Sequence, residues 1–193
     1  MVNKRTAVVA EDEALIRLDL VSMLTDAGIE VLAAVADGRS AIDAVEKFQP
    51  SIALLDIAMP ELDGITVASE ITNQKICPVV MITAYSQVEL VERAATAGAM
   101  GYLVKPVNPA NLVPAIEVAI ARFEQMNLLS AEVEQVTERL EVRKIVDRAK
   151  GLLQSSLGID EAQAFRWLQK AAMDNRTSMR DVAQGVIDKM GTV

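Results

Sequence analysis

Short apolar runs alternate with longer amphipathic stretches through the first 121 residues of the chain. The apolar runs predict buried strands at residues 6–10, 30–34, 52–55, 79–82 and 102–104. The stretches after them predict helices at residues 14–26, 41–48, 65–73 and 87–97, and from residue 111 onward. Such an alternation is typical of a parallel sheet covered by helices on both faces. Because crossovers between parallel strands are right-handed, we expect a doubly wound five-stranded α/β domain.

The region after Asn108 predicts helix without interruption. No glycine or proline occurs from residue 115 to residue 150, which indicates one long helix or two helices in tandem. Five apolar residues in it follow the spacing of a coiled-coil seam: Met126, Leu129, Val133, Val136 and Leu140. Two heptads are fewer than the roughly three or four that establish a coiled coil. Two interpretations stay open: a seam that pairs two chains, and an amphipathic helix that packs within one chain.

The C-terminal part of the chain carries helix-capping signals. Asp160 with Gln163 three positions later is a capping-box pattern. Ser178 with Asp181 has the same spacing and predicts a second helix start. These signals delimit three predicted helices, at residues 139–154, 161–174 and 179–189. Their apolar stripes would form a small three-helix core: Ile145, Ala149 and Leu152; Phe165, Leu168 and Ala172; Val182, Val186 and Met190.

The amino-acid composition is typical of a protein with packed cores, and it limits which kinds of metal and catalytic site are possible. Hydrophobic residues make up 51% of the 193 residues and charged residues 24%. No apolar run approaches the roughly 18 residues of a membrane span, and acidic residues follow the start too early for a signal peptide, so we expect a cytoplasmic protein without membrane contact. Cys77 is the single cysteine and histidine is absent, which excludes a Cys/His zinc site and a histidine base. Any bound metal must be a hard ion with oxygen ligands.

The net charge of −8 is distributed unevenly along the chain. Residues 1–121 hold eight Lys/Arg against sixteen Asp/Glu, whereas residues 137–193 hold ten against eight. This asymmetry indicates an acidic module joined to one that tolerates a polyanion. The small positive excess of the tail is nevertheless far below that of a strongly basic nucleic-acid binder.

Polar residues follow the predicted strands at their C-terminal ends, the edge where open α/β sheets place their sites. In chain order they are Glu11 and Asp12, Asp56, Thr83 and Ala84, and Lys105. Carboxylates brought close together repel one another, and a hard divalent cation such as Mg²⁺ relieves that repulsion. A threonine hydroxyl and a lysine ammonium both suit phosphoryl oxygens. The pattern therefore predicts a phosphoryl site with Asp56 as the acceptor.

Four segments carry these strand ends: VVAEDE, LLDIAMPELDG, VVMITAY and GYLVKP. On them, residues 1–121 resemble the flavodoxin-like receiver domain of two-component response regulators. The resemblance implies that Asp56 accepts a phosphoryl group from the phosphohistidine of a sensor histidine kinase. It also implies that such a domain is a switch, acting only on its own phosphorylation and dephosphorylation, and not a metabolic enzyme. The residues implied are Glu11, Asp12, Asp56 and the carbonyl of Ala58 for Mg²⁺, and Thr83, Ala84, Tyr102 and Lys105 for the phosphoryl group and the switch.

Three positions qualify this resemblance. Glu11 stands where many receivers have aspartate; it lengthens the arm without changing the charge, and we expect Mg²⁺ binding to survive it. Asp63 is interpreted as a turn former before Gly64 and not as a ligand. Because the chain has no histidine, the phosphoryl group must come from another molecule.

The tail carries a second set of motif residues: Asp147, Ala149-Lys150-Gly151, Glu161-Ala162, Ala164-Phe165, Leu168, Ala171-Ala172-Met173 and Asp181-Val182-Ala183. On them, residues 140–190 resemble the ANTAR domain, an RNA-binding three-helix module of transcription antiterminators. Gln169 stands where many relatives have arginine, which removes one candidate phosphate contact. The RNA-binding candidates are Arg143, Lys144, Arg148, Lys150, Gly151, Arg166, Trp167, Lys170, Arg176 and Arg180. A solvated cationic face and a packing role for Trp167 are the structural alternatives.

Together these patterns predict a receiver domain at residues 1–121, a helical linker at 122–138 and an ANTAR three-helix domain at 139–193. The leading hypothesis is a phosphorylation-controlled regulator whose tail binds RNA hairpins in nascent transcripts and causes antitermination. Whether phosphorylation also forms a homodimer stays open. The alternative functions are a DNA-binding regulator and a protein-interaction output. Asp181 and Asp188 make the helix at 179–189 a poor reader of a DNA groove.

Overall fold

The computed structural model describes residues 5–84 and 88–190. Contacts between residues divide the chain into two compact units, one ending at Asn127 and one beginning at Leu128. Among the described helices, none combines the length and the apolar character that a membrane crossing requires.

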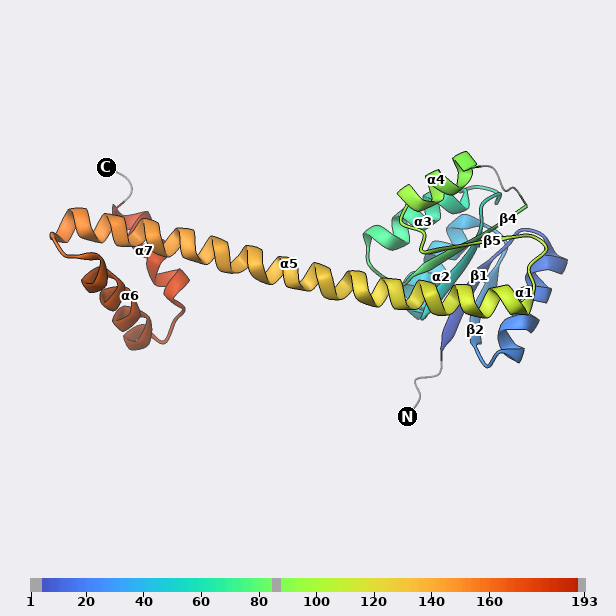
Figure 1. Cartoon of the computed structure of the whole chain (residues 1–193), viewed down its shortest axis with the longest axis horizontal. Helices are drawn as coiled ribbons and strands as arrows, with labels where there is room; N and C mark the ends of the chain where they lie inside the picture. Colours follow the sequence, from blue (N-terminus) through green and yellow to red (C-terminus); the bar gives the residue numbers. More distant parts are fainter. Residues whose placement is uncertain (1–4, 85–87, 191–193) are drawn as a thin grey trace. The chain divides into compact units, whose positions relative to one another are not determined.

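The first unit is built on a five-stranded sheet in which all strands are parallel (Figure 1). The strands lie in the order β2-β1-β3-β4-β5. Their bounds are β1 Thr6–Ala10, β2 Glu30–Val35, β3 Ile52–Asp56, β4 Val79–Thr83 and β5 Gly101–Val104. The prediction of a parallel, doubly wound sheet is therefore confirmed. The central strands β3 and β4 are buried along their whole length, as their unbroken apolar runs require.

Helices cover both faces of this sheet and form two cores. Neighbouring residues of β1 divide between them, because successive side chains of a strand point to opposite faces: Val8 packs with α2, α3 and α4, and Val9 packs with α1 and the first turns of α5. Residue 87, where the sequence predicts the fourth helix to begin, lies outside the described residues. The helices are α1 Ala14–Asp26, α2 Gly38–Phe48, α3 Gly64–Asn73, α4 Val88–Thr96 and α5 Pro109–Leu157.

The predicted first helix is present, but it buries one side of its apolar surface and leaves the other exposed. Leu20 and Leu24 lie in the core with Ile16 beside them, whereas Leu15 and Leu18 are 79% and 65% exposed. Because apolar residues occur all around this helix, their spacing does not decide which side faces the sheet.

Cys77 lies in the core just before β4 and is 1% exposed. Burial raises the pKa of its thiol to about 12. The thiol therefore stays protonated at neutral pH, and Cys77 acts as a small apolar side chain and not as a nucleophile.

The second unit contains the C-terminal part of α5, followed by α6 (Glu161–Asn175) and α7 (Met179–Met190). Of the two alternatives for residues 115–150, the structure has one uninterrupted helix. A complete capping box starts α6: Asp160 Oδ1 accepts the N–H of Gln163 at 2.7 Å, and Gln163 Oε1 accepts the N–H of Asp160 at 3.1 Å. Ser178 Oγ accepts the N–H of Asp181 at 3.1 Å at the start of α7. Both predicted caps are confirmed.

The three helices of the second unit share one core. Its fully packed members are Val146, Ala149, Leu153, Ala164, Leu168, Ala183 and Val186. The predicted place of Phe165 in this core is wrong, because its side chain is 42% exposed. Ala164, one position earlier, faces α5 and α7 in its stead. An alanine at that position lets the helices approach closely, and the larger aromatic ring is turned outward.

Candidate functional site

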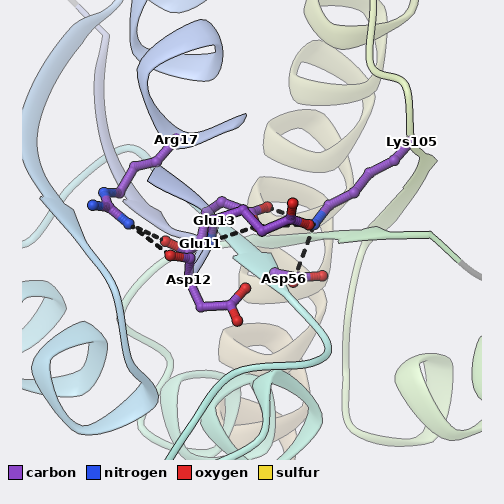
Figure 2. A network of polar contacts seen from close by, with 6 residues as sticks. All are labelled: Glu11, Asp12, Glu13, Arg17, Asp56 and Lys105. Carbon is purple, nitrogen blue, oxygen red and sulfur yellow. Dashed lines mark hydrogen bonds and ion pairs between the residues drawn. The ribbon is translucent and has the colours of Figure 1, made fainter. Parts of the chain in front are cut away.

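The acidic residues predicted at the strand ends meet at one edge of the sheet (Figure 2). Glu11 and Asp12 directly follow β1, and Asp56 is the last residue of β3. One carboxylate oxygen from each lies within 4.8 Å of the other two. Glu11 and Asp56 are buried, whereas Asp12 is exposed. This arrangement follows from the parallel pairing of β1 and β3, which brings their C-terminal ends side by side.

Lys105, just past β5, extends its ammonium group between the two buried acids (Figure 2). Its Nζ donates to Glu11 Oε1 at 2.9 Å and lies 3.1 Å from Asp56 Oδ2. Its side chain is only 11% exposed. The peptide bond from Lys105 to Pro106 is cis. Two strand ends and the loop after a third thus converge on one buried ion-pair cluster.

Burial dominates the electrostatics of this cluster. Desolvation raises the pKa of Glu11 against the opposing hydrogen bond from Lys105, and the charge of Asp56 raises it further. Desolvation also raises the pKa of Asp56, although Lys105 and the backbone N–H groups of Ile57 and Ala58 oppose it. For Lys105, desolvation alone would lower the pKa, but the hydrogen bonds to Glu11 and Asp56 outweigh it and the pKa is raised. Lys105 therefore keeps its proton and its positive charge. Additional positive charge nearby would stabilise the ionised forms of Glu11 and Asp56.

The donor set fits a hard divalent cation. Glu11 Oε2 is buried and has no hydrogen-bond partner among the described residues, although it lies 2.8 Å from Lys105 Nζ as an ion pair. Three carboxylates beside one close ammonium leave an excess of negative charge. Carboxylate oxygens with room for water on the side of exposed Asp12 are the ligands that Mg²⁺ prefers.

Two residues of this network have no clear signal in the sequence. Arg17 donates from Nη1 to the carbonyl oxygens of Glu11 and Asp12, one turn into α1 (Figure 2). Glu13 donates its N–H to Glu11 Oε1 at 3.3 Å, and its carboxylate lies 4.0 Å from Lys105 Nζ. Both fix the loop after β1. Because Arg17 binds main-chain oxygens, no pairing of side-chain types along the sequence could indicate it.

The remaining predicted residues of the first unit lie on or next to the same strands. Thr83 ends β4 and is buried, and its carbonyl accepts the N–H of Lys105 at 2.8 Å. Ala84 follows it and is exposed, as is Ala58 in the turn after β3. Tyr102 lies on β5 beside Met81 of β4 and is half-buried against the core under α2, α3 and α4.

Asp63 and Gly64 shape the loop that follows Asp56. Asp63 caps α3, with Oδ1 accepting the N–H of Thr66 at 2.7 Å, which agrees with its interpretation as a turn residue. The N–H of Gly64 donates to the carbonyl of Ile57 at 3.0 Å. A Cβ on Gly64 would lie 1.9 Å from the carbonyl oxygen of Asp56. Glycine is therefore required for α3 to start this close to the end of β3.

The candidate cations of the second unit fall into two groups. Lys150 is held inside the unit: its Nζ lies 2.7 Å from both Asp147 Oδ1 and Glu161 Oε1, and its side chain is 14% exposed. Arg143 and Lys144 also have acidic partners on α5. The other group has no acidic side chain within 4.0 Å among the described residues and consists of Arg148, Arg166, Lys170, Arg176 and Arg180. Of these cations, only Lys150 links two helices, because Arg143 and Lys144 pair within α5 and their side chains are exposed.

Gly151, beside Lys150, lies exposed in the last two turns of α5. A Cβ there would meet no other atom within 4 Å among the described residues. A glycine inside a helix lowers its stability relative to alanine, and nothing in the described chain requires it at this position.

Family models match both parts of the chain. Residues 7–117 match the response regulator receiver domain, and residues 134–187 match the ANTAR domain. The transcriptional regulatory protein PdtaR of Mycobacterium tuberculosis is 50% identical over 188 residues, which cover 97% of this chain and 92% of that protein.

Solved structures match the first unit. The signal receiver domain of a modulated diguanylate cyclase from Desulfovibrio desulfuricans superposes with a TM-score of 0.60 and 30% identity, over 64% of this chain and 99% of that one. CheY in a CheX-CheY-BeF3-Mg²⁺ complex from Borrelia burgdorferi gives a TM-score of 0.55 and 28% identity, over 58% of this chain and 86% of that one. With a receiver sheet, its strand-end acids and an ANTAR segment on one polypeptide, the chain belongs to the response regulator family, as a transcriptional regulator with an ANTAR output.

Proposed function

We propose that Asp56 accepts a phosphoryl group from a sensor histidine kinase, and that this modification controls binding of RNA hairpins by the second unit, leading to transcription antitermination. The observation that carries the proposal is the convergence of Glu11, Asp12 and Lys105 on Asp56 at the sheet edge. In this view the receiver spans residues 1–121, a helical linker spans 122–138, and the ANTAR domain spans 139–193.

The proposed transfer uses the residues of this cluster. A carboxylate oxygen of Asp56 attacks the phosphorus of a phosphohistidine on the kinase, the P–N bond breaks, and the imidazole leaves with the bonding electrons. Lys105, already 3.1 Å from Asp56 Oδ2, is placed to contact the incoming phosphoryl oxygens. Glu11, Asp12, Asp56 and the carbonyl of Ala58 would hold Mg²⁺, which supplies positive charge against those oxygens. A CheY structure with both Mg²⁺ and BeF3 supports such a pairing of ion and phosphoryl analogue in this fold.

Thr83, Ala84 and Tyr102 are the proposed route from the site to the surface. The backbone link between Lys105 and the carbonyl of Thr83 joins the phosphate-contacting lysine to the end of β4. A phosphoryl group adds about two negative charges and would attract the Thr83 hydroxyl, and Ala84 is the exposed residue that follows Thr83. A shift of β4 at this point would act on its neighbour β5, where Tyr102 is half-buried and packs against the core under α2, α3 and α4.

RNA hairpins and duplex DNA are expected to bind very differently to the phosphorylated protein. The helix α7, which a DNA-binding alternative would use, carries Asp181 in its first turn and Asp188 near its end, and these acids repel the DNA backbone. Salt-titrated binding should therefore give at least about tenfold tighter binding of hairpins than of duplex DNA at equal ionic strength. Equal and negligible binding of both would favour a protein-interaction output.

Phosphorylation is also proposed to pair two chains along α5. Leu129, Val133, Val136 and Leu140 are all roughly half exposed or more and repeat at heptad spacing within the second unit. Sedimentation velocity should show a shift from monomer to dimer when the protein is treated with beryllofluoride and Mg²⁺. A mass that stays at 20.8 kDa under both conditions would argue against pairing.

A further inference from the structure

Arg17 lies one turn into α1, and its guanidinium points back toward the loop that follows β1 (Figure 2). Its Nη1 donates to the main-chain carbonyl oxygens of Glu11 and Asp12, at 3.3 Å for Asp12. The side chain is half-buried, and among the described residues no carboxylate lies within 4.0 Å of it. Arg17 therefore binds the backbone of the loop and not an acidic side chain.

No other described side chain binds these two carbonyl groups. Glu13 occupies the N-cap position of α1, but its side chain makes no capping hydrogen bond. The N–H of Glu13 donates to Glu11 Oε1 at 3.3 Å, which holds the side chain of Glu11 and not its carbonyl group. Because α1 starts without a side-chain cap, Arg17 is the side chain that fixes the backbone between β1 and α1.

Asp12 depends on this backbone more than the other two acids of the cluster do. Lys105 contacts the carboxylates of Glu11 and Asp56. The carboxylate of Asp12 is exposed and has no hydrogen bond or ion pair within the described part of the chain. One of its oxygens nevertheless lies within 4.8 Å of oxygens from both other acids. With no partner to hold the side chain, its direction follows from the backbone that Arg17 binds.

Arg17 and Lys105 would affect a bound cation in different ways. Lys105 occupies carboxylate oxygens of the cluster, whereas Arg17 occupies only carbonyl oxygens and leaves the carboxylates available. Residues that hold metal ligands in place without touching the metal commonly contribute about 10- to 100-fold to metal affinity.

We infer that Arg17 is a positioning residue for the Mg²⁺ site, because it fixes the backbone from which Glu11 and Asp12 present their carboxylates beside Asp56. The inference rests on the proposed phosphoacceptor function, in which these acids hold Mg²⁺. Positioning and charge have effects of opposite sign. Removal of a nearby positive charge would by itself strengthen the binding of a second cation, whereas loss of positioning weakens it.

Binding of Mg²⁺ to the full-length protein separates these two effects. Magnesium chloride is added stepwise without a phosphodonor, and amide NMR signals report the dissociation constant at a temperature where far-UV circular dichroism shows each variant folded. Arg17→Met keeps an unbranched side chain without a charge or a donor, and it is expected to bind Mg²⁺ at least about tenfold more weakly than wild type. The matched control Arg39→Met removes the same charge from an exposed position of α2 and should bind Mg²⁺ like wild type.

Arg17→Lys keeps the charge and a donor on a shorter side chain. Its affinity for Mg²⁺ should therefore lie between those of Arg17→Met and wild type, and it carries the test if Arg17→Met does not fold. Half-maximal phosphorylation by acetyl phosphate should require correspondingly more Mg²⁺ in both variants. Equal or tighter Mg²⁺ binding by the folded variants would overturn the inference alone and leave Arg17 with a purely structural role. If wild type itself bound no Mg²⁺, the proposed metal-assisted transfer would be overturned with it.

Discussion

Asp56→Asn is expected to abolish phosphorylation of this protein. The amide oxygen of asparagine is a far weaker nucleophile than a carboxylate, and the variant keeps the size and hydrogen-bonding shape of the side chain. Incubation with a small phosphodonor such as acetyl phosphate and Mg²⁺, followed by intact-mass measurement, should show one added phosphoryl group on wild type. The variant should show none, which corresponds to a rate loss on the order of 10³-fold or more.

The same substitution should not unfold the protein. Burial raises the pKa of Asp56 and of Glu11, so the folded state binds protons more readily than the unfolded chain. Their contribution to stability is present at low pH and is lost as pH rises above the ordinary carboxyl range through the raised pKa values. At neutral pH without metal, Asp56→Asn removes one of these costly charges, and its melting temperature should equal or exceed that of wild type. Asp43→Asn, the same change at an exposed site on α2, is the control and should be phosphorylated normally. A phosphorylated Asp56→Asn protein would remove Asp56 from the role of acceptor.

The sheet and the acid cluster could be predicted because their signals are local in sequence. A short apolar run such as residues 52–55 favours a buried strand, and a carboxylate at its end needs partners that parallel pairing brings from neighbouring strands. The order of the strands then determines which acids lie together. Because β1 and β3 are parallel neighbours, Glu11 and Asp12 lie close to Asp56. The bounds of each strand changed by no more than one residue for the same reason.

What the sequence did not reveal depends on packing between elements. The choice between the two apolar sides of α1, which leaves Leu15 exposed, is made by the sheet it packs on. Phe165 follows helical spacing with Leu168, yet the space between the three helices accepts only Ala164. Lys150 resembles an RNA-binding cation in a motif, but its two acidic partners come from different helices, and only the fold brings Glu161 to it.

Gly64→Ala is expected to cause the largest loss of stability of any single-methyl addition to the first unit. The new Cβ would lie 1.9 Å from the carbonyl oxygen and 2.9 Å from the carbonyl carbon of Asp56, and 3.1 Å from Met81 Cε. The first two are backbone atoms that cannot rotate away, so either the start of α3 or the end of β3 must move. We expect a loss of about 2–4 kcal/mol in the free energy of unfolding, measured as a lower urea midpoint by far-UV circular dichroism.

The displacement should also slow phosphorylation, because the displaced carbonyl group belongs to Asp56, the proposed phosphoryl acceptor. Phosphoryl uptake by Gly64→Ala should therefore fall even under conditions where the variant is folded. Gly185→Ala is the matched control: this glycine lies within α7, its Cβ would meet no described atom within 4 Å, and the variant should gain about 0.5–1 kcal/mol from the helix preference of alanine. Trp167 fluorescence follows unfolding of the unit that contains Gly185. If Gly64→Ala unfolded at the wild-type midpoint and took up phosphoryl groups at the wild-type rate, the close approach of α3 to Asp56 would not be what positions the acceptor.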